Sequence, residues 1–170
     1  DPRYKRALGV GYAVSPTGAD HNHNLHDTAF AKEGRALREL RFYGEDFQPL
    51  PIEDLSEAKI RMLWTKTRER GFVNSLVMCD FVPWTPEEWR EALYAATGWR
   101  LSPEEMLEVG ERTLQLTRLF NLREGISPEE DRLPERFFQP FRKGNPEARL
   151  DPEAFREGVR AYRRLAGWEG

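Results

Sequence analysis

Cys79 is the one cysteine in this 170-residue sequence, and its thiol is the side chain best suited to bind a soft metal. Thiolates hold iron-sulfur clusters and many zinc ions. A cluster normally takes about four such ligands, so the others would have to lie on residues outside this sequence. The alternative is that Cys79 packs in the core, because free cysteine often behaves as a small hydrophobic residue. Composition alone leaves both interpretations open.

The three histidines, His21, His23 and His26, come directly after a turn sequence at residues 15–20 that contains proline and glycine. Their spacing is not that of a zinc signature, and a polar loop is one interpretation. The other is a proton donor or acceptor that works near pH 7. We rank His21 as the catalytic candidate because Asp20 is adjacent to it on a tight turn.

The element that leads to Cys79 is a predicted helix over residues 54–70. Four residues recur at i, i+3, i+4 and i+7, which is the pattern of one face of an amphipathic helix: Ile60, Leu63, Trp64 and Thr67. Cys79 should therefore lie at or just beyond a helix end, where unpaired backbone groups are accessible.

Four downstream segments each offer an N-cap oxygen, a proline at the first helical position and acids in the first turn. They begin at Thr85, Ser102, Ser127 and Asp151, and the first three also have the glutamate spacing of a capping box. Three of them predict regular helices. After Ser127 a proline follows too soon, so we expect one turn, a loop and a short helix over residues 135–138.

The rest of the sequence predicts helix rather than strand. Residues 4–14 are apolar and small, and residues 31–40 could form a short helix within a long surface connection over 27–53. Alternating strand patterns are nearly absent. The fold class is therefore all-α: an irregular multi-helix domain with long loops that spans residues 1–170.

Composition excludes several partner classes. Charged residues make up 32% of the sequence and the formal net charge is -3, so nucleic acid is not an expected partner. No apolar run approaches the roughly 20 residues of a membrane span. A single cysteine fits a reducing cytoplasm, and we expect a soluble cytoplasmic protein. The first residue is an aspartate, which we interpret as a cut within a longer polypeptide.

Several collinear stretches resemble one known family. The most specific covers residues 97–112, Thr-Gly-Trp-Arg-Leu-Ser-Pro-Glu-Glu-Met-Leu-Glu-Val-Gly-Glu-Arg, and the pattern continues through 118–125 and 131–137. Residues 15–21 and the stretch around Cys79 match in the same order. Nearly the whole chain is thus similar to the C-terminal helical region of the tungsten-containing aldehyde ferredoxin oxidoreductases.

The resemblance implies cofactors. In that family an N-terminal β-rich domain and two helical domains enclose tungsten held by two pterins, beside a [4Fe-4S] cluster. The fourth cluster cysteine closes an Asp-x-x-Gly-Leu-Cys motif that also contacts a pterin. By resemblance Cys79 is that metal ligand, and His21 lies near the tungsten pocket. The implied cofactor-binding residues are Asn74, Ser75, Leu76, Val77, Met78 and Cys79.

The resemblance also implies an activity. The family oxidises aldehydes to carboxylic acids, and electrons pass from tungsten through pterin and cluster to ferredoxin. Expected partners are the N-terminal domains of the same polypeptide, a small aldehyde, and ferredoxin or a similar acceptor; molybdenum could replace tungsten. The isolated fragment is expected to hold no cofactor and to be inactive. The alternative is a non-catalytic helical interaction module in which Cys79 is buried.

Two positions depart from the motif. Asn74 stands where the family has aspartate, which keeps an acceptor oxygen but loses the charge. Val77 and Met78 stand where it has Gly-Leu, so a branched side chain occupies a place where backbone would approach the cofactor. We expect cofactor binding to be altered there.

Overall fold

The computed structural model describes residues 1–79, 81–140 and 148–168, and within them the chain is helical and without strands. This confirms the all-α prediction. The elements are α1 (Arg6–Val14), η1 (Asp27–Ala29), α2 (Arg35–Arg41), α3 (Glu57–Ser75), α4 (Pro86–Thr97), α5 (Pro103–Arg123), η2 (Pro128–Glu130), η3 (Glu135–Phe137) and α6 (Pro152–Leu165). The three η elements are single 3-10 turns.

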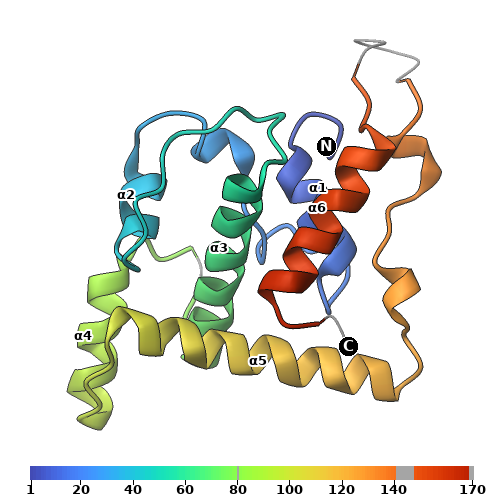
Figure 1. Ribbon diagram of the computed structural model, residues 1–170. Helices are drawn as coiled ribbons and strands as arrows, with labels where there is room; N and C mark the ends of the chain where they lie inside the picture. Colours follow the sequence, from blue (N-terminus) through green and yellow to red (C-terminus); the bar gives the residue numbers. More distant parts are fainter. Residues whose placement is uncertain (80, 141–147, 169–170) are drawn as a thin grey trace.

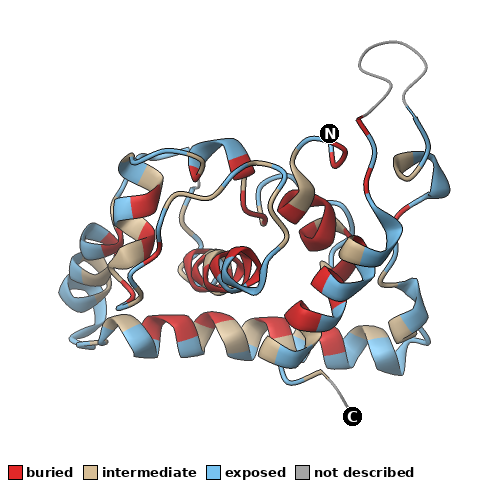
Figure 2. Cartoon of the chain, turned by 45° about the horizontal axis from the view of Figure 1, so that its top comes forward, coloured by how far each residue is buried: buried red, intermediate tan, exposed pale blue. Residues whose placement is uncertain are grey.

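Helix α3 is the centre of the fold. It stands upright among α1, α2 and α6, and α5 passes across its lower end (Figure 1). Seen along its axis, α3 is ringed by the other elements (Figure 2). The predicted amphipathic pattern is therefore wrong in one respect. Its four residues are buried, but so are Met62 and Phe72 on other sides, together with the polar Lys59 and Thr65. A helix buried on most sides has no single apolar stripe.

Two glycines let α3 and α5 cross at close range. A Cβ atom on Gly71 would lie only 2.7 Å from the carbonyl oxygen of Gly110, and a Cβ atom on Gly110 would overlap the carbonyl of Arg68. The backbones themselves are thus in contact at this point. Just beyond it, the hydroxyls of Ser75 and Thr113 lie 3.0 Å apart and join the end of α3 to α5.

Helix α1 has no local side-chain cap, and Asp27 caps it from a distance. The Asp27 carboxylate accepts the backbone N–H groups of Ala7 and Leu8 at 3.3 and 3.1 Å. Lys59 of α3 lies 3.5 Å from the same carboxylate, and both side chains are fully buried. Burial raises the pKa of Asp27, against the opposing influence of Lys59 and the two amides.

The downstream cap predictions are mostly confirmed. Thr85 and Ser102 form complete capping boxes at α4 and α5, and the Asp151 carboxylate accepts the Ala154 N–H at the start of α6. At Ser127 the glutamate spacing does not form a capping box. The Ser127 hydroxyl bonds to the Glu129 side chain instead, and only the turn η2 follows. The predicted sequence of turn, loop and short helix is confirmed there by η2 and η3.

Among the described residues, no helix is both long enough and apolar enough to cross a membrane.

Replacing Lys59 with methionine should lower the free energy of unfolding by about 3–5 kcal/mol, because it leaves the Asp27 carboxylate buried without its cation. Chemical denaturation followed by circular dichroism measures the change. The same substitution at exposed Lys32 is the matched control and should leave the midpoint in place. In the double variant Asp27→Asn/Lys59→Met, part of the loss should be recovered, since neither remaining side chain is charged. A Lys59→Met protein as stable as the wild type would contradict this account.

Candidate functional site

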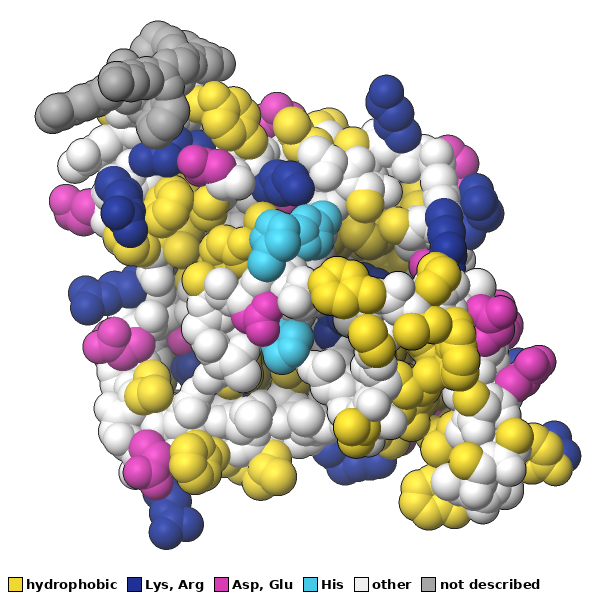
Figure 3. All heavy atoms as spheres, turned by 180° about the vertical axis from the view of Figure 1, so that it is seen from behind, with side chains coloured by type: hydrophobic (Ala, Val, Ile, Leu, Met, Phe, Trp, Pro, Cys, Tyr) yellow, Lys and Arg dark blue, Asp and Glu magenta, His cyan; other side chains and the backbone are white. Residues whose placement is uncertain are grey.

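The structure brings the histidine loop and the end of α3 onto one face. The loop over residues 15–26 joins α1 to η1, and its histidines are grouped near the middle of the surface in Figure 3. His23 Nε2 lies 2.8 Å from the amide nitrogen of Asn74 in the last turn of α3. The two groups of site residues expected from the sequence are therefore in direct contact, although His23 and Asn74 lie 51 positions apart in the sequence.

His21 is exposed, and its imidazole has a partner that the sequence did not indicate. The Tyr12 hydroxyl lies 2.8 Å from His21 Nδ1. The His21 carbonyl accepts a hydrogen bond from His26 Nε2 at 3.0 Å, and the two rings meet edge to face with centroids 4.2 Å apart. Tyr12 belongs to α1, and only the path of the loop back along that helix brings it beside His21.

We ranked His21 first because Asp20 is adjacent to it in the sequence, but the Asp20 carboxylate points toward other groups. The predicted pairing of Asp20 with His21 is therefore wrong. Asp20 directs one carboxylate oxygen toward His23 Nδ1 at 3.8 Å, and the other accepts the Asn22 N–H at 2.7 Å. His23 thus lies between an acid on its Nδ1 side and Asn74 on its Nε2 side. Neighbours in sequence turn their side chains different ways in a tight turn, so adjacency was a poor guide to contact. The catalytic role of His21 stays a prediction.

His26 is held as a neutral imidazole. Its Nε2 donates to the carbonyl of His21, and its Nδ1 lies 3.4 Å from the Lys5 ammonium, which can only donate. Burial lowers the pKa of His26, the charges of His21, Lys5 and Arg70 lower it further, and the bond to the His21 carbonyl partly opposes them. The His26 ring is therefore held within the loop and stabilises it.

The segment from Asn74 to Cys79 divides into exposed and packed residues. Asn74, Val77 and Cys79 are exposed, whereas Leu76 and Met78 are half-buried against the core. The Ser75 hydroxyl donates to the Gly71 carbonyl within α3. With Ser75 also exposed, four of the six predicted cofactor-binding residues therefore lie on the surface.

Cys79 lies four residues beyond the end of α3, as the sequence predicted, and its thiol is free and exposed. The alternative in which Cys79 packs in the core is therefore wrong. The physical reason is that the chain leaves the core after Met78 and runs over the surface toward α4. Among the described residues no group of three or more His, Cys, Asp or Glu side chains is arranged to hold a metal ion.

Val77 has a left-handed backbone, with φ of 57°. That region strains a β-branched residue, and glycine is the residue that usually occupies it. Its side chain is 92% exposed, so packing offers no compensation at this position. The segment therefore keeps a turn that suits glycine while carrying valine.

Exposed apolar side chains continue from this segment. Between residues 77 and 99 they include Val77, Phe81, Trp84 and Trp99. Figure 3 shows a broad hydrophobic area at its lower right. Trp89 of α4, by contrast, is buried. An apolar surface of this kind commonly marks a contact with another part of a protein.

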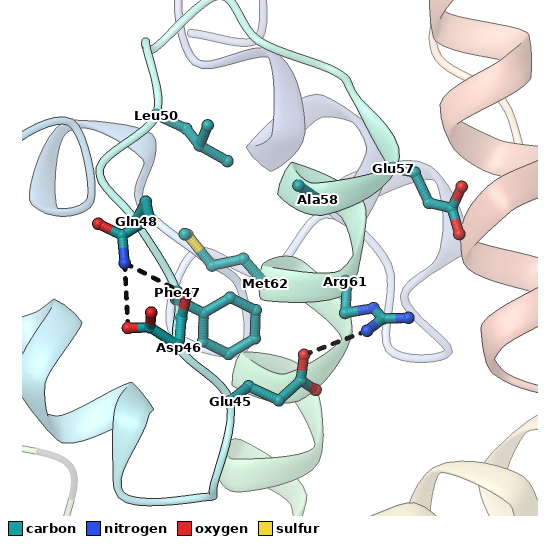
Figure 4. A pocket seen from close by; sticks show the side chains of 9 residues that line it. All are labelled: Glu45, Asp46, Phe47, Gln48, Leu50, Glu57, Ala58, Arg61 and Met62. Atoms are coloured by element: carbon teal, nitrogen blue, oxygen red, sulfur yellow. Dashed lines mark hydrogen bonds and ion pairs between the residues drawn. The ribbon is translucent and has the colours of Figure 1, made fainter.

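A separate hollow lies beside the first half of α3 and shares no residue with this site (Figure 4). The Arg61 guanidinium reaches across its edge to the Glu45 carboxylate at 3.6 Å, and Phe47 and Met62 form its apolar wall. The Arg61 guanidinium therefore neutralises Glu45, one of the acids that line the hollow.

Comparison with known proteins identifies the family to which this chain belongs. The model for aldehyde ferredoxin oxidoreductase, domains 2 and 3, matches residues 1–170. Tungsten-containing aldehyde ferredoxin oxidoreductases from Thermococcus kodakarensis and Pyrococcus furiosus are each 30% identical to this chain over 172 residues, and that from Pyrococcus abyssi is 29% identical. Each alignment covers 99% of this chain but 26% of the relative. The chain therefore spans about a quarter of the length of these curated relatives.

Replacing Val77 with glycine should raise the free energy of unfolding by up to about 1 kcal/mol, because relief of left-handed strain exceeds the entropy that glycine adds to the unfolded chain. Denaturant titration measures it. Val82→Gly, on the same surface stretch but without a positive φ, is the control and should destabilise slightly. If both glycines destabilise equally, the turn at Val77 is not strained.

The lowered pKa of His26 predicts how stability depends on pH. Between that lowered pKa and the unfolded value of about 6.5, the unfolded chain binds more protons, so the free energy of unfolding rises with pH. This contribution is complete above about pH 6.5 and is lost on acidification. His26→Gln keeps an N–H donor but cannot titrate, so its stability should change less between pH 5 and 7.5 than the wild type. Identical pH slopes would contradict the assignment.

Proposed function

This chain belongs to the aldehyde ferredoxin oxidoreductase family, and we propose that it forms the C-terminal helical domain of a tungstopterin, iron-sulfur enzyme. That enzyme would oxidise a small aldehyde to its carboxylic acid and pass the electrons to ferredoxin or a similar acceptor. The chain spans about a quarter of relatives named as tungsten-containing, which supports a role as one part of a larger catalytic unit. Its other parts would be the N-terminal domains of the same polypeptide.

The observation that carries the proposal is the contact between His23 and Asn74. This contact holds the histidine loop beside the segment that ends in Cys79. A substrate and an electron-accepting metal group could therefore both bind at the same face of the chain. A catalytic side chain and a metal ligand must lie close together if electrons are to leave the substrate through the metal site.

The residues present fit an iron-sulfur ligand. Cys79 is exposed and free, on a chain segment outside the core. A [4Fe-4S] cluster is held by about four thiolates, so the one cysteine of this sequence would supply a single ligand and other segments the rest. Cys79 would hold the cluster through its thiolate, which is the soft ligand such iron prefers.

The fit to a pterin is partial. Val77 keeps the left-handed turn that would suit the glycine of the family motif, but its exposed side chain projects from that turn. The Asn74 amide is already engaged by His23, and the Ser75 hydroxyl by Gly71. Backbone groups of residues 74–78 would therefore contribute more to pterin binding than these side chains.

When bound, a tungsten or molybdenum bis-pterin would take up the two electrons of the aldehyde as it is converted to the acid, and the cluster would pass them on singly. The chain's own residues would hold and orient these groups. His21 would hold or donate a proton at the oxygen of the substrate, a role that imidazole performs well near neutral pH. The apolar residues Phe81 and Trp84 would help to exclude water once covered by neighbouring domains.

Elemental analysis of the complete natural polypeptide, purified without oxygen, tests the proposal. We expect tungsten or molybdenum together with iron, and aldehyde-dependent reduction of ferredoxin. The variant Cys79→Ser should lose most of its iron, and once iron has been removed from both proteins it should unfold close to the wild type, because the exposed thiol makes no core contact. Unchanged iron in both Cys79→Ser and Cys79→Ala would exclude this residue as a ligand. A wild-type polypeptide with neither tungsten nor molybdenum would overturn the tungstopterin assignment.

A further inference from the structure

We propose that Tyr12 is a positioning residue that fixes the tautomer of His21, so that the imidazole proton resides on Nε2. The inference rests on the proposed function only in its last step, where His21 faces the substrate. Its structural basis is the 2.8 Å contact between the Tyr12 hydroxyl and His21 Nδ1.

The favoured direction of this hydrogen bond follows from the chemistry of the two groups, because a phenol is a better donor than acceptor and an unprotonated imidazole nitrogen is a strong acceptor. Tyr12 lies on α1, half-buried, and burial and the carboxylate of Asp20 both raise its pKa. Its hydroxyl therefore stays protonated at neutral pH and is available as a donor. A neutral imidazole has one acceptor nitrogen and one N–H, so a donor at Nδ1 leaves the proton on Nε2.

His26 restrains the same ring from the other side. Because a carbonyl oxygen only accepts and an ammonium only donates, the contacts of His26 with the His21 carbonyl and with Lys5 fix His26 as the Nε2–H tautomer. The edge of one ring meets the face of the other, with an interplanar angle of 90°. The backbone and the ring plane of His21 are thus both held.

The consequence concerns the exposed side of His21. With Nδ1 occupied by Tyr12, the Nε2–H on the far side of the ring can donate to an oxygen atom of a bound carbonyl compound or carboxylate. Without Tyr12, the ring would divide between two tautomers, and the one with a bare Nε2 would repel such an oxygen. Tyr12 thus acts through His21 and touches no substrate itself.

The test labels the complete polypeptide with 15N-histidine and reads the ring nitrogens of His21 by NMR, assigned by their loss in His21→Asn. We expect the Nε2–H form in the wild type and a mixture of tautomers in Tyr12→Phe. Tyr94→Phe is the matched control, because it removes a phenol that bonds to Arg100 at a different place. In steady-state assays Tyr12→Phe should lower kcat roughly 10-fold, the size of one lost hydrogen bond, with a smaller effect on KM.

The outcomes distinguish the positioning role of Tyr12 from the proposed function. A wild-type His21 protonated on Nδ1, or a tautomer unchanged by Tyr12→Phe, overturns the positioning role whatever the kinetics show. A mixed tautomer with lower kcat supports both the positioning role and the proposed function. A mixed tautomer with unchanged kcat supports the positioning role and shows instead that His21 does not face the substrate.

Discussion

The buried ion pair between Asp27 and Lys59 is the contact on which the arrangement of the site depends. Asp27 follows the histidine loop by one residue and caps the first turn of α1, while the loop itself starts at the other end of that helix. The loop is therefore tied to both ends of α1 and must run back along it. Lys59 attaches this assembly to α3. Tyr12 can meet His21 only because the loop is fixed in this way.

The other half of the site is positioned by the end of α3. At Gly71 and Gly110 the backbones of α3 and α5 touch, and any side chain larger than hydrogen would drive the helices apart. That close crossing fixes where the last turn of α3 emerges, and hence where Asn74 meets His23. Both halves of the site are thus carried by α3, one through Lys59 near its start and one through Asn74 at its end.

Local signals in the sequence predicted the fold well, and long-range contacts explain what they missed. The caps at Thr85, Ser102 and Asp151 depend on residues three positions apart, so their helices begin where expected. The burial of Lys59 depends on an acid 32 positions away in sequence, which no periodicity reports. The position of Cys79 beyond a helix end was predictable. The partner of His21 was not, because it depends on how the loop folds back.

The two departures from the family motif have different physical consequences. At Val77 the turn persists although valine is strained there, so its conformation is imposed by Leu76 and Met78, which pack against the core on either side.

At Asn74 the side-chain amide donates to His23 Nε2, which places the ring proton on Nδ1, facing Asp20. A carboxylate at position 74 could only accept, so together with Asp20 it would favour a ring that carries both protons and faces an acid on each side. With asparagine at this position, a ring that carries a single proton on Nδ1 already has a suitable neighbour on each side.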